Sequence, residues 1–166
     1  MKELKFTLLA VCLAMTTFAF HSCNSDDGGS SAPSPAFQAA LMKLYPGAVN
    51  IDWEQKGTYY VADCRADARE RQVWFDAGAN WVMTETELET INNLPPAVLT
   101  AFMESNYADW IVDDIDMLEF PNEPTPEFVV EVKNGNQEVD LYFSDGGGLL
   151  HEKNVTDGDD THWPRI

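Results

Sequence analysis

Two stretches of the chain place apolar residues on one face of an amphipathic helix. In the first stretch the apolar positions follow the i, i+3, i+4, i+7 spacing and are Phe37, Ala40, Leu41 and Leu44. In the second stretch the matching positions are Val98, Ala101 and Phe102. Each stretch begins with a proline, Pro35 or Pro96, which fits the first helical position because its missing N–H is not needed there. The pattern predicts two short helices, each with one face to bury against a sheet.

After each predicted helix, apolar and polar residues alternate with the period of two that is typical of half-buried strands. We expect four strands after each helix. The residues expected to face the helices are Tyr60, Ala62, Cys64, Val73, Phe75, Phe128, Val130, Val132, Val139, Leu141 and Phe143. Their alternates, among them Tyr59, Trp74 and Tyr142, then point to the opposite side of the sheet. Asn134-Gly135 predicts a tight hairpin between two of the strands.

The whole pattern occurs twice. Residues 35–42 resemble residues 96–103 at an offset of 61 positions, and the later strands match at an offset of 68. The extra residues fall in the Pro-rich run 120–126, where a loop insertion costs little free energy. We therefore expect an α+β fold in two layers, a tandem duplication of a helix plus four-stranded antiparallel sheet unit, with the helices on one face of a curved sheet. The repeats are expected over about residues 35–93 and 94–155.

The first 22 residues have the composition of a secretory signal peptide. Two lysines precede an apolar run of about fifteen residues, which is too short to span a membrane but suits the hydrophobic core of a signal. Cys23 follows at once, and residues 19–23 resemble a relaxed form of the lipobox of Gram-negative lipoproteins, whose cysteine is lipidated after cleavage. Phe20 and His21 depart from the usual lipobox residues. The alternative is an ordinary signal peptide that is cut elsewhere, with Cys23 incidental.

Three further segments are expected after the signal peptide. Residues 23–34 are rich in Gly, Ser and Pro and should form a disordered tether, because they have no apolar group to bury. The acidic residues after Cys23 either resemble the surface-export signals of some Gram-negative lipoproteins or belong to a simple solvated linker. A single domain, 35–155, and an acidic C-terminal tail, 156–166, follow. The expected location is the Gram-negative cell envelope, as an outer-membrane lipoprotein that faces the periplasm or the cell surface.

The composition is strongly acidic. The chain has 10 Lys and Arg against 28 Asp and Glu, and loss of the signal peptide, with two lysines and one glutamate, leaves 8 against 27, a net charge of −19. Such a surface repels nucleic acid and anionic lipid headgroups, and it favours a basic partner or divalent cations. Acidity also aids solubility. Cys64 is the cysteine that remains once Cys12 is removed and Cys23 is lipidated, so we expect no internal disulfide and interpret Cys64 as a small core residue.

Short motifs recur in a fixed order along the domain. They are Leu94-Pro95 before a helix, Tyr45-Pro46 at a helix end, Val49-x-Ile51-x-Trp53, and the turn pairs Phe75 with Gly78 (one residue short) and Phe143 with Gly147. Through these motifs, residues 35–155 resemble the PepSY-like, beta-lactamase-inhibitor-like family of secreted Gram-negative proteins. The resemblance implies helices on one face of antiparallel four-stranded units, which can join into one broad curved sheet, and it implies no catalytic residues. In the inhibitor for which the family is named, the open sheet face grips a protein.

The residues themselves carry no recognisable active site. No histidine or cysteine spacing is typical of a zinc site, and no Ser or Cys nucleophile has a base at a recognisable spacing, so we predict no metal, no cofactor and no enzyme activity. Asp157-Gly158-Asp159-Asp160 lacks the spaced oxygen ligands of an EF-hand, and a solvated acidic tail explains it better than a calcium site.

We predict a monomeric, lipid-anchored envelope module that holds an unknown protein or peptide on its exposed sheet face, with inhibition as one form of this activity. The candidate binding residues are Tyr59, Trp74 and Tyr142, because aromatic side chains are common anchors at interfaces. Alternatively, these side chains pack cross-strand, beneath a loop or beneath the C-terminal Trp163-Pro164 segment. The other functional classes are an envelope hydrolase with an unrecognised site and a structural or cation-buffering surface lipoprotein.

Overall fold

The computed structural model describes residues 33–156, 158 and 160–165, so the predicted signal peptide, Cys23 and nearly all of the tether lie outside the described residues. The helices are α1 (Pro35–Leu44), the 3-10 helix η1 (Ile91–Asn93) and α2 (Pro96–Met103). The strands are β1 (Val49–Lys56), β2 (Tyr59–Ala66), β3 (Arg69–Phe75), β4 (Trp81–Glu87), β5 (Ile111–Glu119), β6 (Glu127–Asn134), β7 (Gln137–Ser144) and β8 (Leu149–Asn154). Both α-helices begin at the prolines that the sequence pattern indicates.

The strands form one continuous eight-stranded antiparallel sheet in the order β1-β2-β3-β4-β5-β6-β7-β8. The predicted duplication of a helix plus four-stranded sheet unit is therefore wrong, because the molecule is mostly one sheet with two short α-helices. Strands β4 and β5 join the halves, with Thr84 paired to Glu119 and Glu87 to Asp116. This pairing satisfies backbone N–H and C=O groups that two separate sheets would leave exposed at their edges.

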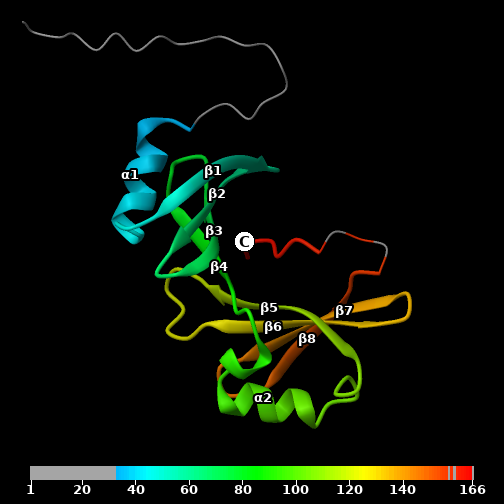
Figure 1. Ribbon diagram of the computed structural model, residues 1–166. Coiled ribbons are helices and arrows are strands. Elements are labelled where there is room, and N and C mark those ends of the chain that lie inside the picture. Colours follow the sequence, from blue (N-terminus) through cyan, green and yellow to red (C-terminus); the bar gives the residue numbers. More distant parts are fainter. Residues whose placement is uncertain (1–32, 157, 159, 166) are drawn as a thin grey trace, which may run out of the picture.

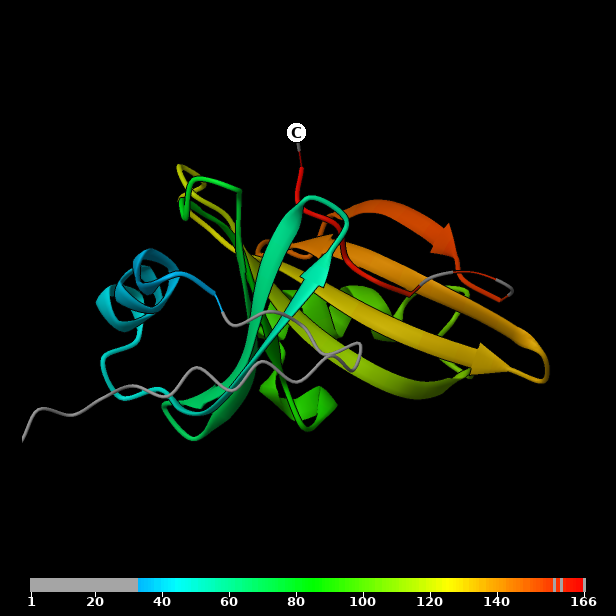
Figure 2. The same cartoon turned by 90° about the horizontal axis from the view of Figure 1, so that it is seen from above.

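Both α-helices lie on the same side of the sheet, on the outside of its bend (Figure 1). Helix α1 lies beside β1 to β4, helix α2 lies below β5 to β8, and the C-terminus lies within the bend. Figure 2, seen from above, shows β1 and β2 crossing the direction of β6 and β7. We call the side of the sheet that faces away from the helices the inner face.

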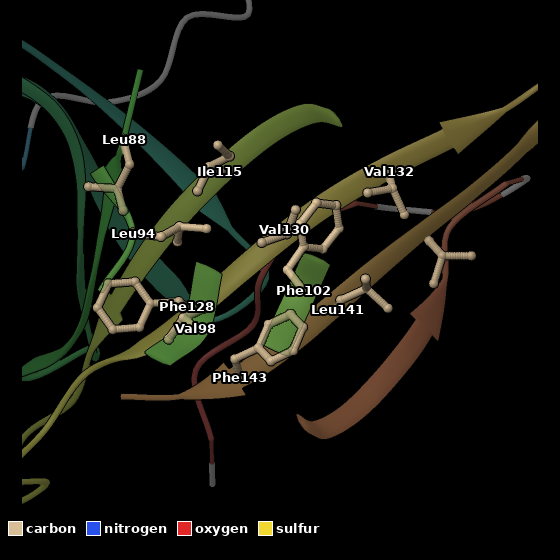
Figure 3. Packing of buried hydrophobic residues seen from close by; sticks show 11 residues of the cluster. Leu88, Leu94, Val98, Phe102, Ile115, Phe128, Val130, Val132, Leu141 and Phe143 are labelled. Carbon is tan, nitrogen blue, oxygen red and sulfur yellow. The ribbon is translucent and has the colours of Figure 1, made fainter. Parts of the chain in front are cut away.

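Each helix packs on the sheet through its own apolar cluster. The cluster under α1 contains Phe37, Leu41, Ala62, Cys64, Ala66, Val73 and Phe75. The cluster under α2, shown in Figure 3, contains Val98, Phe102, Phe128, Val130, Val132, Val139, Leu141 and Phe143. The assignment of these strand residues to the helix side is confirmed, with Tyr60 half-buried at the margin of the first cluster. Cys64 is buried in the cluster under α1, as predicted, and burial raises the pKa of its thiol.

Two turns explain local details of the sheet. The hairpin predicted at Asn134-Gly135 forms one residue later, because Asn134 still pairs with Gln137 and Gly135, with a φ of +64°, is the first turn residue. In the turn between β7 and β8, Gly147 has a φ of +82°. A Cβ atom at Gly147 would lie 2.4 Å from the carbonyl oxygen of Ala97, so only glycine allows this turn to approach the first turn of α2.

Candidate binding face

Two stripes of side chains cross the inner face from strand to strand. The polar stripe consists of Asp63, Gln72, Glu85, Asp116, Glu131 and Asp140, one residue on each strand from β2 to β7. The apolar stripe consists of Val61, Trp74, Met83, Leu118, Val129 and Tyr142, each two positions along the same strand from its polar neighbour. Residues two positions apart share a face of a strand, so the stripes run side by side. The strand register pairs Gln72 with both Asp63 and Glu85, and Trp74 with both Val61 and Met83.

Residues 160–165, here called the C-terminal segment, lie over these stripes without regular secondary structure. His162 is only 8% exposed. Its Nε2 atom lies 3.5 Å from Oδ2 of Asp116 in the polar stripe, and its Nδ1 atom lies 2.8 Å from the hydroxyl oxygen of Tyr142 in the apolar stripe. Lys153 of β8 donates a hydrogen bond of 3.2 Å from Nζ to the carbonyl oxygen of Thr161. The segment is therefore held by side chains of the sheet as well as by its own.

The next residues of the C-terminal segment continue along the apolar stripe. The ring of Trp163 lies edge-on to the ring of Trp74, with centroids 5.7 Å apart. The guanidinium group of Arg165 lies 4.8 Å from the centroid of Phe120 and forms an ion pair with Glu127. One imidazole, one indole and one guanidinium group thus anchor a short segment of the chain on the inner face.

The predicted binding residues lie on the inner face, but the C-terminal segment covers them. Trp74 is 0% exposed and Tyr142 is 6% exposed, while Tyr59 is half-buried with its ring 6.0 Å from that of Trp74. We expected Trp74 and Tyr142 to be exposed on an open face, but both are buried. Their position beneath the C-terminal segment agrees with the alternative stated in the sequence analysis. Covering large aromatic rings with Trp163 removes apolar area from water. In the described part of the predicted tail, 156–166, His162 and Pro164 are buried, whereas Gly158, Asp160 and Arg165 are exposed and Trp163 is 46% exposed while it contacts Trp74.

Sequence reasoning missed the charged residues of the inner face. Glu85, Asp116 and His162 are far apart in sequence, and no motif links them. Asp140 did carry a signal, because it interrupts the apolar run of β7 at a position that points away from the helices. A charged residue in such a run indicates a buried polar partner.

Burial gives the inner face unusual electrostatics. Burial raises the pKa of Glu85 to about 7, and the nearby charge of Asp116 acts in the same direction. Burial also raises the pKa of Asp140, which is 0% exposed and whose Oδ1 atom has no hydrogen-bond partner among the described residues. Burial acts to lower the pKa of His162, but the hydrogen bond to Asp116 and the charge of Glu85 outweigh it, and the pKa is raised. The face therefore favours cationic groups beside its carboxylates.

Comparison with known proteins identifies the family of the chain. Residues 58–151 match a family model described as PepSY-like and beta-lactamase-inhibitor-like. The chain belongs to this family. The resemblance drawn from the sequence motifs is thereby confirmed. The eight strands form one continuous sheet. The PepSY-like family has the fold of a binding or inhibitor-like module rather than that of an enzyme.

Solved structures of PepSY-like relatives come from Bacteroides species. A BLIP-like protein of Bacteroides fragilis is 70% identical, with a TM-score of 0.80 over 86% of this chain and 100% of its own. A DUF2874 family protein of Bacteroides ovatus is 34% identical, with a TM-score of 0.74 over 79% of this chain and 94% of its own. A Bacteroides eggerthii protein that is named as periplasmic is also 34% identical, with a TM-score of 0.72 over 78% of this chain and 93% of its own.

Two further findings bear on location. The relatives indicate the envelope or periplasm as the location of this PepSY-like protein. Among the described residues, neither helix has the length and apolar character needed to cross a membrane. The comparison with curated proteins returned no match.

Proposed function

We propose that this PepSY-like protein is a lipid-anchored binding module of the bacterial cell envelope that holds an extended segment of a partner protein on its inner face and thereby inhibits that partner. In this proposal residues 1–22 are the signal peptide, and Cys23 carries the lipid after the signal peptide is cleaved. The tether, 23–34, then carries the single domain 35–155, and the protein acts as a monomer on the outer membrane.

One observation carries the proposal: the inner face is already occupied by a short segment of its own chain. His162 lies on the polar stripe, while Trp163 and Arg165 lie along the apolar stripe and its margin. Each of these contacts uses a side chain, and none of them requires the segment to be covalently continuous with the sheet. A face that accepts one peptide segment in this way has the chemistry to accept another.

The contacts also define the chemistry of the partner segment. The polar stripe supplies carboxylates, so it favours a basic side chain or a protonated imidazole. The apolar stripe presents Trp74 and Tyr142, which suit an aromatic side chain. The strong net negative charge of the chain attracts basic segments at long range and speeds their encounter. The partner segment is therefore extended, with basic and aromatic residues near each other.

The decisive experiment opens the inner face without shortening the protein. The triple variant His162→Ala, Trp163→Ala, Arg165→Ala removes the three anchors of the C-terminal segment. A fluorescent peptide with the sequence of residues 160–166 should bind this variant about 10- to 100-fold more tightly than it binds the wild type. The wild-type segment competes from within the molecule at an effective concentration of the order of mM.

Fluorescence anisotropy measures both affinities, and a peptide in which the His, Trp and Arg are replaced by Ala is the matched control. Circular dichroism establishes that the triple variant is folded. A folded triple variant that binds the peptide no better than the wild type would remove the inner face as the binding surface. The same variant is then the better bait for a partner in envelope extract.

A further inference from the structure

Three potential metal ligands from three separate segments converge on the inner face. Glu85 comes from β4, Asp116 from β5 and His162 from the C-terminal segment, and one ligand atom of each lies within 4.8 Å of the others. Asp116 and His162 are buried, and Glu85 is half-buried. All three line one hollow of about 200 Å³ on the inner face. This convergence depends on the β4–β5 pairing and on the position of the C-terminal segment, so no local sequence motif records it.

The geometry fits a small divalent cation. Metal–ligand bonds of about 2.0–2.1 Å place neighbouring ligand atoms of a tetrahedral zinc site about 3.3 Å apart. The Nε2 atom of His162 and the Oδ2 atom of Asp116 are already 3.5 Å apart. Glu85 has a longer side chain, which can move toward the other two by a change of rotamer. Three protein ligands also leave a further coordination position for water or for a group of a bound partner.

The other ring nitrogen of His162 is held as it is in known metal sites. A metal-bound histidine usually hydrogen-bonds through its second nitrogen, which fixes the orientation of the ring. Here the Nδ1 atom lies 2.8 Å from the Tyr142 hydroxyl and 4.0 Å from Oδ2 of Asp140. This arrangement directs the Nε2 lone pair of the neutral imidazole toward Asp116 and Glu85.

Asp140 lies on the Nδ1 side of His162, opposite the Nε2 atom that faces Asp116, and its charge is incompletely compensated. It is completely buried, and its Oδ1 atom has no hydrogen-bond partner among the described residues. Its nearest cation apart from His162 is Lys153, with Nζ 3.9 Å from Oδ2. A buried carboxylate without full compensation is costly. A cation bound at Nε2 of His162 would add positive charge on the far side of the imidazole ring from Asp140.

From these observations we infer that Glu85, Asp116 and His162 bind a divalent transition-metal ion of the zinc class. An imidazole ligand suits zinc, copper, nickel and iron, whereas calcium and magnesium prefer oxygen ligands alone. The two carboxylates provide the charge that balances the ion. Our sequence-based expectation of no metal site is replaced here by a proposal that rests on three-dimensional proximity.

The consequence of such a site is control of the inner face. A bond from the ion to His162 ties the C-terminal segment to β4 and β5, the strands at which the two halves of the sheet meet. With the ion bound, the segment stays on the face. Without it, the segment keeps its other contacts with the sheet but loses the bond to β4 and β5. The ion therefore favours the closed face and disfavours a competing partner segment.

Isothermal titration calorimetry on untagged, full-length mature protein tests the inference with zinc chloride, in parallel with calcium chloride. We expect one zinc ion per chain and a zinc affinity about 100-fold lower in Glu85→Gln and in His162→Ala, since each substitution removes a direct ligand and even the loss of an outer-shell partner costs about 10- to 100-fold. His151→Ala is the matched control, because His151 is an exposed histidine that stacks on the ring of Tyr142, with centroids 4.0 Å apart, and is not one of the three proposed ligands. Its zinc affinity should equal that of the wild type.

Two results would overturn the inference. One is equal zinc binding by the wild type and by folded Glu85→Gln, a variant that keeps the shape of the side chain even where His162→Ala does not fold. The other is equal affinity for calcium and zinc, which would indicate general attraction to an acidic surface. The peptide-binding experiment under Proposed function is carried out in the presence of a chelator. A negative result there therefore refutes peptide binding without bearing on zinc binding.

Discussion

Replacement of Glu85 by glutamine tests the free-energy cost of carboxylates buried on the inner face in the absence of metal. Burial raises the pKa of Glu85 from its ordinary value of 4.5 to about 7. The charges of Asp116 and Asp114 act in the same direction, while those of His162 and Lys56 oppose them. Between these pH values the folded protein holds a proton on Glu85 that the unfolded chain has lost. The free energy of unfolding therefore falls as the pH rises.

The magnitude follows from the raised pKa. Each pKa unit corresponds to about 1.36 kcal/mol, so Glu85 lowers the free energy of unfolding by about 2 kcal/mol between about pH 5.5 and pH 7. Above the folded pKa the decrease levels off. The pKa of His162 is also raised, and its stabilising contribution is likewise lost as the pH rises through that value. Glu85→Gln should remove the Glu85 part of the decrease and reduce the His162 part, because the charge of Glu85 helps to raise the pKa of His162, while the hydrogen bond to Asp116 remains.

Urea unfolding in the presence of a chelator at about pH 5.5 and about pH 8 measures the difference. The wild type should lose about 2 kcal/mol more than Glu85→Gln between these conditions, and the variant should be the more stable protein at the higher pH. Glu89→Gln is the control, because Glu89 is exposed just after β4. Parallel decreases in the wild type and in Glu85→Gln would refute the idea that this buried carboxylate controls stability.

Two further predictions concern the anchor and the sheet. Cys23→Ala should release the mature protein from the membrane fraction and abolish labelling by a palmitate analogue, whereas equal membrane retention would contradict lipidation. Gly147→Ala should lower the free energy of unfolding by about 2–4 kcal/mol, because an added Cβ strains the positive φ and collides with the backbone of Ala97. Gly135→Ala, where φ is also positive but the space is open, should cost about 1–2 kcal/mol in the same chemical denaturation assay.

Local spacing was sufficient to predict the helices, the strands and their faces. The alternation of Phe128, Val130 and Val132 with polar or outward residues is a property of neighbouring positions, and burial on one face of a sheet follows directly from it. The prolines at the first positions of the helices are likewise a local signal, because they favour a helix start at their own position. These features depend on a few adjacent residues, and the structure contains them where the sequence indicates.

The pairing of β4 with β5 could not be predicted in the same way. A repeated pattern shows that two segments are alike, but it does not show whether two sheets stay separate or share an edge. The position of the C-terminal segment was missed for a related reason. The acidic composition of residues 157–160 predicts a solvent-exposed tail. His162 and Trp163, however, contact strands that are distant in sequence. The candidate metal site combines both long-range features.

The consecutive strand order has a consequence for folding in the envelope. Each strand pairs with the strand next to it in sequence, and the hairpin pairings close short stretches of chain, which favours their rapid formation, whereas the β4–β5 pairing closes the longer stretch that contains α2. The contacts of the C-terminal segment span β3, β5 and β7, through Trp74, Asp116 and Tyr142, and they exist only after both halves of the sheet have assembled. The chain end therefore arrives at a finished surface. A partner segment that is present while the protein folds reaches the inner face before the C-terminal segment covers it. In the folded protein, the same partner segment must first displace the C-terminal segment, so it binds more slowly.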